Sequence, residues 1–176
     1  MDQIFKRTSI RRYLDQPVEA EKTEYLLKAA MQAPSAGNQQ PWEFYVITNR
    51  DILEKLSKIS PYAGPAARAP IAIAAAVRNE CEWPQVSDYD VSLAMGNMWL
   101  AAGDVGLGGV WLGVSPFKDR MDAVSEILNL PDSVRPFAIF AYGYPARSLK
   151  RTTDSIRQKF TKSNNGKGVL RQQGSF

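Results

Sequence analysis

Hydrophobic and polar positions fall into blocks along the chain, and these blocks predict alternating helices and strands. Apolar residues in 19–33 recur at helical spacing, and prolines bracket the block at Pro17 and Pro34. Aromatic and β-branched residues dominate 42–48, which indicates a strand. By the same criteria we predict helices at 50–59, 86–105 and 119–128, and strands at 110–114 and 135–145.

Two apolar segments leave alternatives open. Residues 69–77 (APIAIAAAV) are apolar throughout, so periodicity does not distinguish a buried strand from a short apolar helix. Residues 93–102 are apolar nearly all round, which is typical of a helix buried on every side. In a chain of 176 residues, one way to surround such a helix is a partner subunit. From alternation alone, the first interpretation is a layered α/β or α+β domain with a doubly wound parallel sheet.

The glycine-rich segment 106–113 lacks the phosphate-binding fingerprint of a doubly wound fold. Its sequence, GLGGVWLG, departs from G-x-G-x-x-G, and it precedes a strand whereas the fingerprint follows one. Glycines let the backbone approach a flat ring, which Trp111 would support. The alternative is a tight turn before a core strand.

Composition and charge narrow the class of protein. The length fits one domain, which we place at 1–160, followed by a polar basic tail at 161–176. No apolar run reaches the roughly 20 residues of a membrane span, and no secretory signal precedes the domain, so we expect a cytoplasmic protein without membrane contact. The net charge is +4, and basic residues gather in 144–176. We expect a solvated arm and no nucleic-acid partner, because Phe176 is the only aromatic residue in the last sixteen.

The absence of histidine and the single cysteine exclude several kinds of site. Without histidine there is no Cys/His zinc site, no Ser–His–Asp triad and no Cys–His dyad. Cys81 alone forms neither an intrachain disulfide nor an iron–sulfur cluster. We therefore expect no metal, and an enzyme of this composition would use carboxylates, Lys, Arg, Tyr or a cofactor.

Three polar stretches are candidates for binding. In an extended segment Arg7, Ser9 and Arg11 would share one face, and an arginine fork with a hydroxyl suits a phosphate dianion; the alternative is a solvated basic patch. The loop 34–41 (PSAGNQQP) carries amides that both donate and accept, which matches the edge of a heterocycle; the alternative is an ordinary connection. The pair Lys150–Arg151 would close over a phosphate or remain a surface pair.

Taken together, these motifs resemble the nitroreductase family of flavoproteins in order and in spacing. The resemblance spans residues 3 to 151. It rests on R-T-S-I-R-R-Y near the start, P-S-A-G-N-x-Q-P-W-x-F, the D-x-x-x-A-x-x-N-M-x-L-A-A helix from Asp90, G-L-G-G-V-W-L-G and the closing G-Y-P.

The resemblance implies an α+β, three-layer fold with a central mixed or antiparallel sheet flanked by helices, and it argues against the parallel sheet. It also implies a domain-entwined homodimer with FMN at the subunit interface. The segment holding the FMN phosphate and pyrimidine would be Arg7, Thr8, Ser9 and Arg11, and the turn against the ring would be Val110, Leu112 and Gly113. The other subunit would add Pro34, Ser35, Ala36, Gly37, Asn38 and Gln40, and the late basic pair would be Lys150 and Arg151.

The implied activity is that of an oxidoreductase. NADH or NADPH would deliver hydride to the flavin, and nitroaromatics, quinones or similar acceptors would then take it in a ping-pong scheme. Arg11 is the candidate for stabilising the negative charge of the reduced flavin. The alternatives are another flavin reaction on the same scaffold (dehalogenation, flavin fragmentation or ring dehydrogenation) and a flavin-binding protein with negligible turnover.

Overall fold

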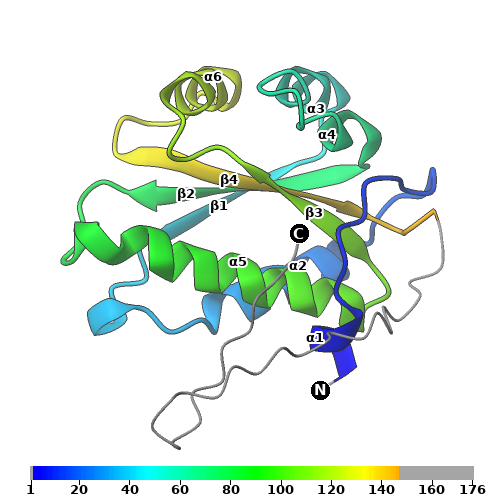
Figure 1. Cartoon of the computed structure of the whole chain (residues 1–176), viewed down its shortest axis with the longest axis horizontal. Helices are drawn as coiled ribbons and strands as arrows, with labels where there is room; N and C mark the ends of the chain where they lie inside the picture. Colours follow the sequence, from blue (N-terminus) through cyan, green and yellow to red (C-terminus); the bar gives the residue numbers. More distant parts are fainter. Residues whose placement is uncertain (1, 147–176) are drawn as a thin grey trace, which may run out of the picture.

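The computed structural model describes residues 2–146, so the predicted tail and the pair Lys150–Arg151 lie outside the described residues. A single four-stranded sheet lies between two layers of helices (Figure 1). The α+β three-layer architecture implied by the resemblance is therefore confirmed. The strands follow the order β1-β2-β4-β3 and comprise β1 (Trp42–Ile47), β2 (Ile71–Arg78), β3 (Gly108–Gly113) and β4 (Val134–Gly143).

The two helical layers differ in the length of their helices. One face of the sheet is covered by α2 (Ala20–Met31) and α5 (Ser87–Asp104), and the other by α3 (Arg50–Leu56), α4 (Pro65–Arg68) and α6 (Lys118–Leu128). Sequence periodicity did not predict α4 or the N-terminal α1 (Asp2–Lys6), because four or five residues are too few to show a helical period. Short 3₁₀ turns occupy Ala36–Asn38 and Pro84–Val86. None of the helices in residues 2–146 combines the length and apolar character needed to cross a membrane.

The doubly wound parallel sheet, the first interpretation from alternation, is wrong. Every strand pair in the described sheet is antiparallel: β1 with β2, β2 with β4, and β3 with β4. The short helices α3 and α4 return the chain to the end of the sheet where β1 finished, which makes the next strand antiparallel. β1 and β4 run in one direction, since each opposes β2, and β2 and β3 run in the other, since each opposes β4. The 18-residue α5, about 27 Å long at 1.5 Å per residue, makes that crossover.

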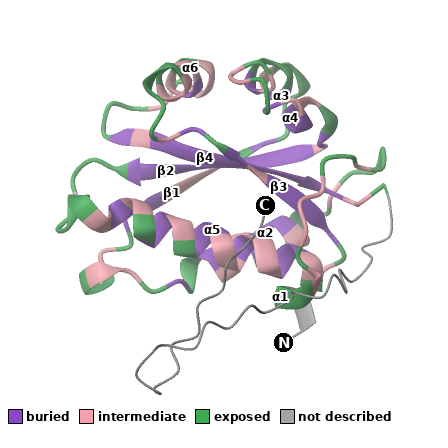
Figure 2. Cartoon of the chain, in the orientation of Figure 1, coloured by how far each residue is buried: buried purple, intermediate pink, exposed green. Residues whose placement is uncertain are grey.

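The segment 69–77 forms a strand, and its burial explains why periodicity could not identify it. Both faces of β2 are covered by helices (Figure 2). Ile71 and Ile73 pack in the core under α2 and α5, whereas Ala72 and Ala74 pack in the core under α3, α4 and α6. A strand buried on both faces has no polar side, so its sequence does not alternate.

The long helix α5 is buried on the side that faces the sheet. Its outward side carries Tyr89 and Leu93, which are 69 % and 50 % exposed, and Figure 2 shows half-buried and exposed residues along that side. The predicted burial on every side is therefore not achieved within one chain.

Two of the glycines predicted to form a turn belong to β3. A Cβ added at Gly109 would overlap the Phe140 ring and lie 2.8 Å from the carbonyl oxygen of Ala141. The absence of a side chain thus lets the Phe140 ring of β4 lie against the neighbouring strand, where it stacks with Tyr142 at 5.5 Å between ring centroids.

We expect Gly109→Ala to lower the free energy of unfolding by roughly 1–3 kcal/mol, because the added methyl group overlaps Phe140 and the β4 backbone. Denaturant unfolding of the unliganded protein measures this. Gly113→Ala, on the same strand, is the matched control, since a Cβ there meets nothing within 4 Å. Equal losses in the two variants would contradict the close-packing explanation.

Candidate functional site

The outer edge of β3 is the central feature of the candidate site. Among residues 2–146, β4 is the only strand of the sheet that pairs with β3. The other edge of β3 meets the N-terminal segment at one bridge, between Ser9 and Gly109. The amide of Ile10 donates to the Gly109 carbonyl at 2.9 Å. Backbone groups alternate in direction along a strand, so the peptide groups of Trp111 and Gly113 face the same open edge. The edge therefore offers both donors and acceptors to a ligand.

A cavity of about 480 Å³ lies at this edge and is strongly basic. Three arginines line it, and no acidic side chain from the described part of the chain does so. It is bounded by the second half of β3, the connection from α3 to α4, and the beginning of α6. The lining residues are Arg11, Ser60, Pro61, Tyr62, Gly64, Pro65, Arg68, Val110, Trp111, Leu112, Gly113 and Arg120.

Backbone carbonyls and an aromatic ring position the arginines. Arg120 donates through Nη1 to the Gly113 carbonyl at 3.2 Å, and its guanidinium lies 4.0 Å from the centre of the Phe117 ring. Arg68 donates through Nε to the Arg11 carbonyl at 3.1 Å. These contacts leave other guanidinium N–H groups to bind an anion, because arginine has five donors.

The N-terminal segment is fixed beside β3 by Tyr13. Its hydroxyl oxygen lies 2.7 Å from the carbonyl oxygen of Ile10 and 2.9 Å from that of Ala141, and its single proton is shared between these two acceptors. Burial raises the pKa of Tyr13, and the positive charges of Arg68 and Arg11 oppose this only in part. The phenol therefore remains protonated at neutral pH and serves as the donor that holds the segment carrying Arg11.

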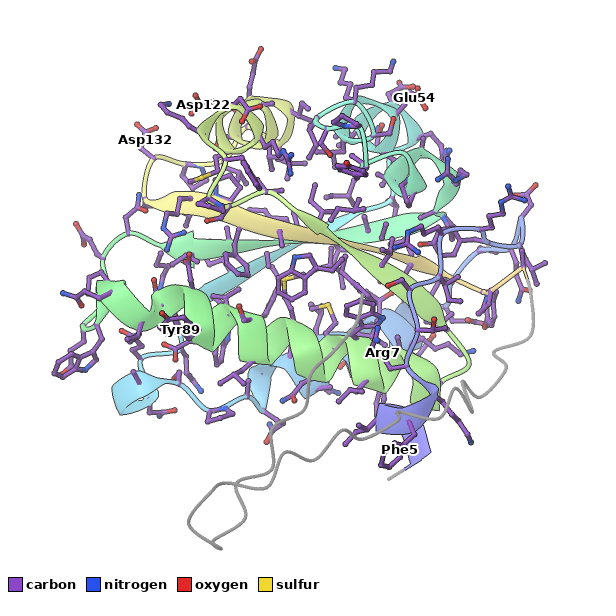
Figure 3. The ribbon with its side chains drawn as sticks, viewed as in Figure 1. Phe5, Arg7, Glu54, Tyr89, Asp122 and Asp132 are labelled. Atoms are coloured by element: carbon purple, nitrogen blue, oxygen red, sulfur yellow. The ribbon has the colours of Figure 1, made fainter. Side chains whose placement is uncertain are left out.

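The N-terminal candidates follow the length of β3. Arg7 lies beside the later part of α5 (Figure 3), with its guanidinium carbon 4.5 Å from the centre of the Trp99 ring. A small cavity of about 20 Å³ there includes Arg7, Thr8 and Gly108. Ser9 and Arg11 line a further cavity of about 300 Å³, and Arg11 also reaches the larger one. Of these four candidates, Arg11 lines the same cavity as Val110, Leu112 and Gly113, whereas Arg7, Thr8 and Ser9 lie beside the beginning of β3.

The loop 34–40 lies elsewhere, at the beginning of α5. Its backbone takes left-handed φ values at Gly37, Asn38 and Gln40, which are +53°, +57° and +45°. The carboxylate of Asp90 accepts from the amide of Ala36 at 3.0 Å. Much of the loop is exposed, including Gly37 and Asn38.

One chain does not bring this loop to the β3 cavity. Asp90 and Trp99 are nine residues apart on α5, which is about 14 Å along the helix. Figure 3 shows Tyr89 at one end of α5 and Arg7 near the other. None of the residues of the loop 34–40 is among those that line the β3 cavity.

Sequence reasoning missed several residues of this arrangement. Arg68 and Arg120 line the cavity, but each lies in a short amphipathic segment where a surface arginine is common. Asp90 and Gln39 were visible only as part of the motifs, without a role. The first turn of α5 carries two acidic residues, Asp88 and Asp90, so the sequence does not distinguish which of them is buried.

We expect Tyr13→Phe to lower the free energy of unfolding by about 1–3 kcal/mol, because it leaves the carbonyls of Ile10 and Ala141 without their donor. Amide exchange at Ile10 should accelerate as the segment loosens from β3. Tyr25→Phe, at an exposed position of α2, is the control. Unchanged exchange at Ile10 would show that other contacts hold the segment.

Comparison with known proteins places this geometry in a family. The family model that matches the chain is that of the nitroreductase family, over residues 4–78 and 61–144. A protein of Methanothermobacter thermautotrophicus, provisionally assigned as an NADH dehydrogenase/NAD(P)H nitroreductase, is 39 % identical over 153 residues, which cover 84 % of this chain and 78 % of that protein.

Solved structures agree with the sequence relatives. The FMN-dependent nitroreductase of Clostridium difficile R20291 matches with a TM-score of 0.84 and 31 % identity, covering 94 % of this chain and 99 % of that one. A protein of Clostridium acetobutylicum, provisionally assigned as an NADH oxidase, matches with a TM-score of 0.82 and 44 % identity, covering 84 % of this chain and 90 % of that one. Both the sequence and the fold thus show that the chain belongs to the nitroreductase family.

Proposed function

We propose that the chain is an FMN-dependent oxidoreductase that transfers hydride from NADH or NADPH, through the flavin, to a small-molecule acceptor. The observation that carries the proposal is the cavity at the open edge of β3, which combines backbone donors and acceptors with three arginines. Family membership supports it, as do the FMN-dependent name of one structural neighbour and the FMN reductase names of two Bacillus subtilis relatives.

The residues at this edge fit the chemical groups of FMN. The pyrimidine part of the isoalloxazine carries carbonyl and N–H groups, which the outward peptide groups of Trp111 and Gly113 complement. The phosphate needs cations and hydroxyls, which Arg7, Thr8 and Ser9 supply at the other end of the strand. The lack of acidic lining among the described residues of the larger cavity would avoid repulsion with the negative charge of a reduced flavin.

Bound FMN would supply the redox chemistry, and the protein would bind, orient and tune it. Arg11 would place a positive charge close to the ring, where reduction leaves negative charge. Leu112 offers no carboxylate at the ring, so we assign no side-chain acid to the reaction. The proton needed by a reduced acceptor would come from water.

We propose nitroaromatics and quinones as acceptors in a ping-pong scheme. In this scheme NAD(P)H and the acceptor would occupy the same place beside the flavin in turn. The cavity opens to solvent beside Tyr62, which is 80 % exposed, so small acceptors would enter without displacing buried structure.

We further propose a homodimer in which each FMN lies at the interface. The separation of the loop 34–40 from the β3 cavity along α5 supports this, as does the exposed apolar side of α5 at Leu93. In this arrangement one chain contributes Arg7, Thr8, Ser9, Arg11, Val110, Leu112 and Gly113, and the second contributes Pro34, Ser35, Ala36, Gly37, Asn38 and Gln40. The role of Lys150 and Arg151 as the late basic pair near the FMN phosphate is proposed from the sequence alone.

The test of the function is the visible spectrum of the purified protein, followed by release and identification of the chromophore. We expect a flavin spectrum, FMN close to equimolar with the chain, and oxidation of NADH or NADPH that accelerates when menadione or nitrofurazone is added. A colourless protein that takes up no added FMN would overturn the proposal. Bound FMN without turnover would favour a flavin-binding protein.

We expect Arg11→Gln to weaken FMN binding by about tenfold or more, the effect of losing one hydrogen bond from a charged donor. The midpoint potential of the bound flavin should also fall, because the cation that stabilises the reduced form is removed. Fluorescence titration with FMN and a potentiometric titration measure the two effects. Lys28→Gln removes an equal charge from an exposed position on α2 and should leave both values unchanged.

A further inference from the structure

Asp90 is a buried carboxylate that accepts hydrogen bonds from two residues of the loop 34–40. Its side chain lies in the first turn of α5 and the residue is only 4 % exposed. One oxygen accepts from the amide of Ala36 at 3.0 Å, and the other accepts from Nε2 of Gln39 at 2.6 Å. Burial of a carboxylate is unfavourable unless hydrogen bonds replace its hydration. The carboxylate of Asp90 therefore favours the positions in which the Ala36 amide and the Gln39 side chain donate to it.

Gln39 connects this carboxylate to a second segment. Its Oε1 accepts from the backbone amide of Trp83 at 2.8 Å, and its Nε2 also donates to the Trp83 carbonyl at 3.2 Å. The side-chain amide is therefore oriented by three partners, and a flip of its oxygen and nitrogen would break all three bonds. The loop 34–40, residue Trp83 and α5 form one connected unit.

The loop needs such support because its backbone is in an unfavourable conformation. Two residues with side chains, Asn38 and Gln40, adopt left-handed φ values, which cost free energy that the surroundings must supply. Nη2 of Arg78 also supports the loop, since it donates to the carbonyls of Gln39 at 3.1 Å and Gln40 at 2.7 Å. The carboxylate and the guanidinium together hold the two ends of the strained segment.

The beginning of α5 suits this role for two reasons. The positive end of the helix dipole stabilises a carboxylate in the first turn. The 18-residue helix also packs in the core beneath the sheet through Met95 and Met98, so Asp90 sits on a rigid element. Groups held from a rigid helix keep their positions more precisely than groups on an unsupported loop.

We propose that Asp90 is a positioning residue of the active site. Through Ala36 and Gln39 it fixes the loop 34–40 in the conformation that presents Asn38 and Gln40 to the flavin of a second copy. The inference rests on the proposed function, because it assumes that this loop reaches a flavin. It adds a residue, Asp90, that does not itself touch the cofactor.

The test is Asp90→Asn in the full chain, reconstituted with FMN. The introduced amide nitrogen would face Nε2 of Gln39, donor against donor, while the remaining oxygen could still accept from Ala36. We expect kcat/KM to fall by roughly 10- to 100-fold, as small misplacements of binding groups do. The visible circular dichroism of the bound flavin should also change, because it reports the surroundings of the ring.

The double variant D90N/Q39E separates positioning from general stability. A glutamate at position 39 would accept from the introduced amide and from the Trp83 amide, which restores the link between α5 and the loop with the charge on the other partner. It gives up the weaker bond from Nε2 of Gln39 to the Trp83 carbonyl. We expect it to recover most of the flavin circular dichroism and of kcat/KM. Asp88→Asn is the control, since it removes a carboxylate from the same helical turn whose partner is Arg135 rather than the loop.

The outcomes distinguish this inference from the function on which it rests. A wild-type chain that binds no FMN overturns both. If the wild type binds FMN and turns over, while D90N matches it in circular dichroism and kcat/KM, the inference alone is overturned. The inference also fails if D90N loses activity only in proportion to its loss of melting temperature, as D88N does, and the double variant restores nothing.

Discussion

The open edge of β3 is the constraint on which the candidate site depends. A sheet of order β1-β2-β4-β3 leaves β3 with one hydrogen-bonded neighbour strand, and its other edge must meet something polar. The N-terminal segment satisfies part of that edge through a single bridge at Gly109. The remainder faces a cavity lined by arginines. An exposed edge that would favour aggregation in another protein thus becomes, in our interpretation, the surface that binds the edge of a heterocycle.

Two kinds of interaction keep this edge available and correctly shaped. Close packing fixes β3 against β4, because the Phe140 ring occupies the space that a side chain at Gly109 would take. The buried hydroxyl of Tyr13 holds the N-terminal segment beside β3. It contacts the carbonyl of Ile10, three residues away in the sequence, and that of Ala141, 128 residues away. Arg11 is therefore held against the sheet rather than on a free terminus, while Arg68 and Arg120 lie on the helices α4 and α6.

Helix α5 relates the two halves of the proposed site. Its first turn holds the loop 34–40 through Asp90, and its later part meets Arg7 through Trp99. Because the helix is continuous and well packed on the sheet side, the two groups stay apart within one chain. This separation supports the homodimer that we propose, in which a second copy would present its loop at the cavity of the first.

Local pattern in the sequence was sufficient for most helices and strands, because apolar spacing directly reflects which side of an element is buried. The motif residues were also visible, and the resemblance they carry anticipated the three-layer fold. Pattern failed where burial removes periodicity, as in β2, and where elements are too short, as in α1 and α4. Strand direction, the open edge of β3, and the approach of Arg68 and Arg120 to it were decided only by the tertiary structure. These features depend on where each connection returns the chain. That is determined by packing between residues distant in sequence, which local pattern does not contain.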